Sequence, residues 1–377
     1  MSLTYAMVGG GIGAFIGEIH RKAIALDNTA TLVAGALSST PEKSIESAKL
    51  LGLPEDRSYG SWQELIDAEP KRKDPVDFVV IVTPNNTHYP IAKACLEAGL
   101  NVVLDKPMTT TAEEARQLAH LANDKGLVCG VTYTYTGYPM VREAAELVRS
   151  GTLGKVRRVE VNFIQGWLAQ NIEAEGQKQA SWRMDPKQAG GGGTLGDIGT
   201  HAEHLASFIT GLEIQSLSAE LTSFGAGRLL DDDAMVHIRY EGGSKGTINV
   251  SQICIGEENS LSVGVFGDKG SVRWSHDNPN DLRIATLDSG VRLVTRGQAG
   301  LSERAAAATR TPPGHPEGYL EAFANIYRGV AELINAKKSG SPIGPLGNDV
   351  PGPEAGIDGM RFVERVIESS NSDGAWV

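Results

Sequence analysis

Short apolar runs alternate with segments of helical spacing through the N-terminal part of the chain. The apolar runs are Tyr5–Val8, Thr31–Leu37, Phe78–Val82, Asn101–Leu104 and Leu127–Val131. The helical segments are Glu18–Leu26, Pro41–Leu51, Ser61–Asp67, His88–Ala98 and Thr111–Lys125. Strands separated by helices of this length form βαβ units, whose crossovers place the strands parallel. The alternation therefore predicts an α/β domain built on a doubly wound parallel sheet.

The pattern changes after Thr132, where strand-like alternation dominates. It occurs in Arg157–Phe163, Leu217–Ser223, Ala234–Tyr240, Lys245–Ile253, Leu261–Phe266 and Gly270–Trp274. Helices are expected at Tyr138–Ser150, Tyr319–Ala336 and Pro353–Ser370. Because a chain of 377 residues exceeds what one core usually supports, we expect two domains, residues 1–132 and 133–377. The second is predicted to be α+β with a large, mostly antiparallel sheet, and to bind substrate and form oligomers.

Composition and charge exclude several classes of protein. The net charge is −11, whereas nucleic-acid binders and polybasic membrane-surface proteins need positive charge. The longest apolar run, Val76–Val82, is too short to cross a bilayer. The cysteines, Cys95, Cys129 and Cys254, form no C-x-x-C pair. With no secretion signal before the first strand, the sequence favours a cytoplasmic protein without disulfides.

A glycine cluster, Gly9–Gly13, joins the first strand to the first helix. Gly9, Gly11 and Ala14 fit the pattern G-x-G-x-x-A, with Ile12 and Gly13 in the loop. Such glycines allow a tight turn and let backbone amides approach a pyrophosphate at the helix N-terminus. The context predicts a Rossmann dinucleotide site, although a glycine-rich turn without a ligand also fits the motif.

The end of the second strand bears on the choice of dinucleotide. An acidic residue is expected there to bind the ribose of NAD, but residues 36–40 read Ala-Leu-Ser-Ser-Thr. Ser38 and Ser39 can hydrogen-bond either a ribose hydroxyl or a 2′-phosphate, and Lys43 can neutralise a phosphate. We expect NAD as cofactor, and the sequence leaves NADP open.

Three polar motifs follow the strands and resemble one family. They are Thr83–His88, Val103–Pro107, and Trp182–Arg183 followed by Gly190–His201. Their order and spacing resemble the Gfo/Idh/MocA sugar and polyol dehydrogenases over essentially the whole chain. One departure is Asp105, where the family usually has glutamate. The resemblance implies that cofactor is contacted by Thr83, Asn85, His88, Asp105, Lys106 and Trp182.

The expected chemistry centres on Lys106, Asp197 and His201. Lys106 precedes a proline, which disfavours helix, and it follows a strand whose carboxyl end lies at the ligand crevice of an α/β sheet. Asp197 and His201 are four residues apart, which on a helix places them on one face. A carboxylate beside an imidazole suits a histidine that accepts a proton. The alternatives are a surface lysine, a helix cap, or a metal site that includes His204; we expect no metal.

Further residues are candidates for substrate binding. Arg183 suits sugar hydroxyls but also fits a surface ion pair, and Tyr135 fits the pocket or the core equally. His315, in a proline-rich loop, is expected to reach a substrate, either in its own subunit or across a subunit interface. Asp231–Asp233 is expected to be a solvated turn that leads into a strand, with contact to a polar ligand as the alternative. His20 and His276 are expected to be structural or solvated.

We therefore predict an NAD(P)-dependent oxidoreductase that transfers hydride from a secondary hydroxyl of a cyclic polyol or pyranose. Inositols and anhydrosugars are the leading substrates. The alternatives are a non-catalytic dinucleotide-sensing regulator and an NAD-assisted glycosidase. The resemblance also implies a homo-oligomer, a tetramer or a dimer.

Overall fold

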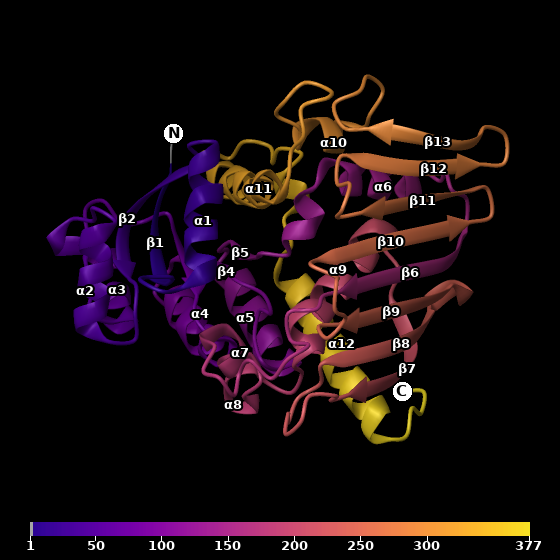
Figure 1. Cartoon of the computed structure of the whole chain (residues 1–377). Helices are drawn as coiled ribbons and strands as arrows, with labels where there is room; N and C mark the ends of the chain where they lie inside the picture. The colour runs from indigo at the N-terminus through magenta and orange to yellow at the C-terminus, as the bar shows by residue number, and fades with distance from the viewer. Residues whose placement is uncertain (1–2) are drawn as a thin grey trace. The chain divides into compact units, whose positions relative to one another are not determined.

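The computed structural model describes residues 3–377, which fold into two compact units (Figure 1). Unit 1 contains the residues up to Thr134 together with Leu320–Ile357. Unit 2 contains Tyr135–Tyr319 and Asp358–Val377. Within the described residues, no helix is long and apolar enough to cross a membrane.

Within residues 3–134, unit 1 has a five-stranded parallel sheet in the order β2-β1-β3-β4-β5. The strands are β1 (Leu3–Gly9), β2 (Ala30–Ala36), β3 (Phe78–Val82), β4 (Asn101–Leu104) and β5 (Cys129–Val131). The helices are α1 (Phe15–Leu26), α2 (Pro41–Leu50), α3 (Trp62–Ala68), α4 (His88–Glu97), α5 (Ala112–Asp124) and α11 (Tyr319–Ser339). The prediction of a doubly wound parallel sheet is confirmed.

Local sequence explains where these elements begin and how they pack. Every residue of β3 is buried, as expected for a central parallel strand with helices on both faces. Helix α5 starts at Thr111, whose hydroxyl accepts a hydrogen bond from the Glu114 amide at 3.2 Å. The Glu114 carboxylate in turn accepts from the Thr110 amide, which completes a capping box displaced by one residue.

The glycine loop packs tightly against α1. A Cβ added to Gly17 would lie 2.3 Å from the Cα of Gly10, and Gly10 itself has φ +75°. The sequence pattern assigned the close helix–strand approach to Ala14. In the structure Ala14 is the N-cap of α1, and Gly17 makes the close approach one helical turn later.

Unit 2 is organised around an eight-stranded sheet, counted over the described residues, in the order β13-β12-β11-β10-β6-β9-β8-β7. Its strands are β6 (Val156–Ile164), β7 (Ile214–Thr222), β8 (Asp233–Tyr240), β9 (Lys245–Ser251), β10 (Ser260–Gly267), β11 (Gly270–Ser275), β12 (Asp281–Thr286) and β13 (Gly290–Thr295). Neighbours pair antiparallel except β6 and β9, so the prediction of a mostly antiparallel sheet is confirmed. The sequence pattern did not predict β12 and β13; the residues of β13 are largely exposed.

Helices cover one face of this sheet. Figure 1 shows α6 (Pro139–Arg149) and α9 (Thr200–Thr210) on that face. The remaining helices are α7 (Lys178–Arg183), α8 (Pro186–Ala189), α10 (Glu303–Ala307) and α12 (Pro353–Asn371), which begins in unit 1 and ends in unit 2. The C-terminal residue pairs with β7, since the amide and carbonyl of Val377 bond Leu217 at 2.9 and 3.0 Å.

We expect Gly17→Ala to destabilise unit 1 by at least about 1–3 kcal/mol, because the added methyl group meets backbone that cannot move independently. Chemical denaturation of the full chain measures the change. The matched control is Gly352→Ala, where an added Cβ meets nothing within 4 Å. Equal stability of the two variants would contradict the packing argument.

Candidate active site

The carboxyl ends of β1, β3 and β4 lie side by side and carry the motifs of unit 1. Gly9 pairs with Val82, and Ile81 pairs with Leu104. The glycine loop, the segment starting at Thr83 and the Asp105–Lys106 segment therefore begin at one edge of the sheet, where ligands of α/β proteins bind.

The glycine loop is built to bring backbone close to a ligand. A Cβ on Gly11 would lie 2.5 Å from the Ser47 hydroxyl and 2.6 Å from the Leu37 carbonyl. The Ser47 hydroxyl also accepts a hydrogen bond from the Ile12 amide at 3.1 Å. Helix α1 starts without a side-chain cap, so its first amides and its dipole suit the pyrophosphate of a dinucleotide.

His88 ties two of the loops together. It is buried, and its ring nitrogens lie 2.9 Å from the Pro107 carbonyl and 2.8 Å from the Thr83 carbonyl. Burial lowers its pKa. The side chain of His88 thus contacts the backbone of the loops after β3 and β4. Thr83 and the buried Asn85 lie in the loop after β3.

Asp105 lies in a network that sequence reasoning did not predict. Its carboxylate accepts from the Thr132 hydroxyl at 2.9 Å and lies 3.6 Å from His20 Nε2. The other ring nitrogen of His20 lies 2.6 Å from the hydroxyl of Tyr327 on α11. Burial alone would raise the pKa of Asp105, but His20, Lys106 and Thr132 together hold it well below its usual range. The network anchors the residue before Lys106, which is joined to Pro107 by a cis peptide bond.

The end of β2 has no carboxylate, as the sequence indicated. Ser38 is half-buried and lies 3.4 Å from the Thr40 amide, while Ser39 and Lys43 are exposed. This edge therefore offers hydroxyls and one cation toward a ribose.

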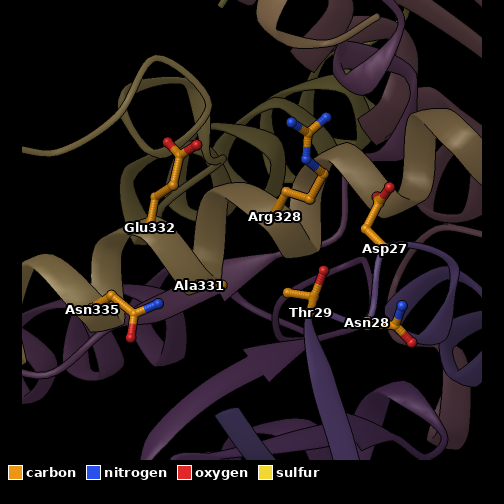
Figure 2. Close-up of a pocket in the computed structure, with 7 residues that line it drawn as sticks. All are labelled: Asp27, Asn28, Thr29, Arg328, Ala331, Glu332 and Asn335. Atoms are coloured by element: carbon orange, nitrogen blue, oxygen red, sulfur yellow. The ribbon is translucent and has the colours of Figure 1, made fainter. Parts of the chain in front are cut away.

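A shallow, open depression of about 340 Å³ lies elsewhere on unit 1 (Figure 2). It is lined by Asp27, Asn28, Thr29, Arg328, Ala331, Glu332 and Asn335. Residues 27–29 precede β2, so the depression is at the amino ends of the strands, opposite the glycine loop. We do not assign it to the candidate site.

In unit 2, Asp197 and His201 lie where a π-helical turn, η5 (Leu195–Gly199), runs into α9. Such turns occur frequently at functional sites. The Asp197 carboxylate lies 3.2 Å from Arg183 Nε and accepts from Gln252 Nε2 at 3.0 Å. His201 is buried, and its ring meets that of Tyr135 edge to face at 4.9 Å. The structure thus places a buried imidazole against an aromatic ring, four residues after an anchored carboxylate.

The expectation that Asp231–Asp233 is a solvated turn is wrong. Asp231 is buried and accepts hydrogen bonds from the Gly193 and Leu195 amides, each at 2.7 Å. Burial raises its pKa to about 6. Asp232 is buried too and pairs with Arg228 at 2.8 Å. Because a glycine run has no side chains to hold it, these backbone contacts fix the segment that leads into η5.

Polar side chains at one edge of the eight-stranded sheet were missed by sequence reasoning. Gln165 follows β6, Gln252 follows β9, His276 follows β11, and Asn259 precedes β10. Isolated Gln and Asn residues in loops form no recognisable motif, so only the strand order brings them together.

The remaining predicted site residues of unit 2 are Trp182, Arg183 and His315. Trp182 stacks under the Arg183 guanidinium at 4.2 Å, and both side chains also bond Gln179. His315 is exposed on a loop held by the buried pair Arg296–Glu317, whose charged atoms lie 2.9 Å apart. Over residues 3–377, no group of three or more His, Cys, Asp or Glu side chains is arranged to hold a metal ion.

Comparison with known proteins identifies the family. Residues 3–133 match the model for the oxidoreductase family with an NAD-binding Rossmann fold, and residues 141–273 match the GFO/IDH/MocA C-terminal domain. An inositol dehydrogenase homologue from Azotobacter vinelandii, solved with NAD+, is 36% identical with a TM-score of 0.95, covering 100% of this chain and 97% of that one. The chain belongs to the Gfo/Idh/MocA family of oxidoreductases.

Two further Gfo/Idh/MocA relatives extend the comparison. The A. vinelandii homologue solved with NADH and myo-inositol is 35% identical with a TM-score of 0.92, covering 100% of this chain and 97% of that one. Levoglucosan dehydrogenase of Pseudarthrobacter phenanthrenivorans is 26% identical, covering 100% of this chain and 98% of its own. Unit 1 is thus an NAD-binding Rossmann domain, and the predictions of an oxidoreductase and of NAD as cofactor are confirmed.

Glu203, a buried acid on α9, makes the stability of this Gfo/Idh/MocA protein depend on pH. Burial, together with the charge of Asp358, raises the pKa of Glu203 to about 8, although the Ser207 hydroxyl opposes the shift. Since the pKa is higher in the folded chain than in the unfolded chain, the stabilising contribution is complete below about pH 4.5 and is lost as pH rises through 8.

We expect Glu203→Gln to gain stability relative to the wild type between pH 5 and 8, by at most about 1.4 kcal/mol per pH unit. The neutral amide avoids the cost of ionising a buried acid. Urea denaturation across this range measures the difference, with Glu241→Gln, at an exposed position, as the control. A constant offset between Glu203→Gln and the wild type would contradict the assignment.

Proposed function

We propose that this protein oxidises a secondary hydroxyl of a cyclic polyol or pyranose sugar, such as an inositol or an anhydrosugar. The observation that carries the proposal is the buried His201 imidazole, packed on Tyr135 and four residues after Asp197, whose carboxylate is held by Arg183 and Gln252. Histidine is the side chain that most often transfers a proton in general acid–base catalysis.

The proposed roles follow from the chemistry of the side chains. His201 accepts the hydroxyl proton, and Asp197 stabilises the positive charge that develops on the imidazole. Lys106, next to the anchored Asp105, polarises the hydroxyl oxygen. When bound, NAD supplies the acceptor for the hydride that leaves the same carbon, so proton and hydride together turn the alcohol into a ketone.

The substrate class is inferred from the character of unit 2. The sheet edge next to Asp197 carries neutral amides and aromatic rings, which suit the several hydroxyls of a polyol. The A. vinelandii homologue was solved with myo-inositol, and the other relative is named for levoglucosan, which supports a cyclic polyhydroxy substrate. The substrate contacts proposed for Tyr135, Arg183 and His315, and the homo-oligomer, stay predictions.

We expect His201→Ala and Lys106→Met each to lower kcat by about 10²–10⁴-fold, because each removes a group that acts on the reacting hydroxyl. Affinity for NAD should change little for His201→Ala, since the dinucleotide binds unit 1. The assay follows absorbance of the reduced cofactor with a panel of inositols, monosaccharides and anhydrosugars, beside binding of NAD+ and NADP+ by calorimetry.

The matched control is His237→Gln, which replaces an exposed histidine of β8 and should leave kcat unchanged. Near-normal rates for His201→Ala would refute the assignment of the base. Tight dinucleotide binding without turnover of any compound in the panel would instead favour a sensor, and glycoside cleavage without net reduction would favour an NAD-assisted glycosidase.

A further inference from the structure

Three amide side chains form a continuous hydrogen-bonded chain at the edge of the sheet in unit 2. We call Gln252, Gln165 and Asn259 the amide relay. Gln252 Nε2 donates to Gln165 Oε1 at 2.9 Å, and Gln165 Nε2 donates to Asn259 Oδ1 at 2.6 Å. One end of the relay meets Asp197, and the other meets Tyr135 and His276.

Asp197 determines which atom donates and which accepts in every hydrogen bond of the relay. Asp197 is paired with Arg183, and an ionised carboxylate can only accept hydrogen bonds. Gln252 must therefore turn its amide nitrogen toward Asp197, at 3.0 Å. The same orientation leaves Gln252 Oε1 to accept from the Thr194 hydroxyl at 2.8 Å, so both ends of this fully buried side chain are satisfied.

The orientation then passes along the relay. Because the second N–H of Gln252 points at Gln165, Gln165 must present its oxygen there and its nitrogen to Asn259. Asn259 accepts from Gln165, so its own nitrogen faces the Tyr135 hydroxyl at 3.2 Å and His276 Nδ1 at 3.4 Å. Flipping any single amide would place two donors or two acceptors face to face.

Two consequences arise at the far end. His276 Nδ1 accepts a hydrogen bond, so the ring proton of the neutral imidazole is on Nε2. The Tyr135 hydroxyl accepts from Asn259, so its own proton is directed away from the relay. Burial lowers the pKa of His276 and raises that of Tyr135 to about 12, so both side chains are neutral at physiological pH.

We propose that the amide relay, oriented by Asp197, fixes Tyr135 as a hydrogen-bond donor to an acceptor oxygen of the substrate and His276 as the Nε2–H tautomer. Gln252, Gln165 and Asn259 are positioning residues in this proposal, and Tyr135 selects the substrate. The Tyr135 ring packs on His201, so the oxygen it recognises belongs to a substituent close to the hydroxyl that His201 deprotonates. This part rests on the proposed function and narrows the substrate to one with an oxygen beside the reacting carbon, as in a vicinal diol.

The first test reads the tautomer directly and needs no substrate. We expect nitrogen NMR of the full chain with labelled histidine rings to show His276 with an unprotonated Nδ1, assigned by loss of the signal in His276→Gln. Asn259→Asp should move the proton to Nδ1 at alkaline pH, because a carboxylate can only accept. Tyr135→Phe should leave the tautomer unchanged. A wild-type ring protonated on Nδ1 overturns the relay even if the enzyme is a sugar dehydrogenase.

The second test separates the role of Tyr135 from general damage. Tyr135→Phe and Asn259→Asp should each lower kcat/KM by about two- to tenfold, the cost of one neutral hydrogen bond. In Asn259→Asp the hydroxyl proton of Tyr135 is captured by the new carboxylate, so the double variant should be no worse than either single one.

The control is Asn162→Asp on β6, which keeps its hydrogen bond from Asn249 at 2.9 Å and lies outside the relay. It should retain wild-type kcat/KM. Multiplied losses in the double variant would show that the two residues act separately, and would overturn the assignment of Tyr135 as a donor. If no sugar is turned over at all, the proposed function fails, while the tautomer measurement still decides the direction of the relay.

Discussion

Buried strands must satisfy their backbone polar groups within the sheet, and this constraint places the chemistry of both units at strand ends. Inside the strands the side chains are committed to the core, as in β3, where every residue is buried. The polar side chains that can contact a ligand therefore lie just after the last hydrogen-bonded residue of a strand. Lys106 comes after β4 in unit 1, and Gln165 and Gln252 come after β6 and β9 in unit 2. The parallel pairing of β6 with β9 is what brings those two glutamines to the same edge.

The buried carboxylates of unit 2 have different roles, which depend on the groups that surround them. Asp231 receives two backbone amides and holds a glycine run that has no side chains of its own. Asp197 lies beside an arginine and accepts a hydrogen bond from an amide, and in the proposed relay it sets the direction of its neighbours. Glu203, six residues after Asp197, has Asp358 near it instead of a cation, and burial raises its pKa to about 8. Burial also raises the pKa of Asp231, to about 6, but two backbone amides oppose that shift, whereas the charge of Asp358 adds to the shift of Glu203.

The two units contribute different chemistry to the proposed reaction. Unit 1 supplies tight glycine packing and an uncapped helix start for a dinucleotide, with Lys106 anchored through Asp105. The use of aspartate where the family usually has glutamate leaves an acid that still reaches both Thr132 and His20. Unit 2 supplies an imidazole and neutral amides, which recognise hydroxyl groups without demanding charge from the substrate.

The sequence by itself indicated the parallel sheet and the glycine turn, and it offered Lys106, Asp197 and His201 as candidates, because periodicity and motif spacing are local properties. It missed β12 and β13, and it wrongly placed Asp231 in solvent, since an acidic run gives no sign of the backbone amides that cover it. Tertiary structure alone decided that Gly17 rather than Ala14 makes the close helix contact, and that Gln165, Gln252 and Asn259 form one relay. The two hydrogen bonds of the relay join residues that are separated in sequence by 87 and by 94 positions. Such pairings depend on strand order, which no local pattern encodes.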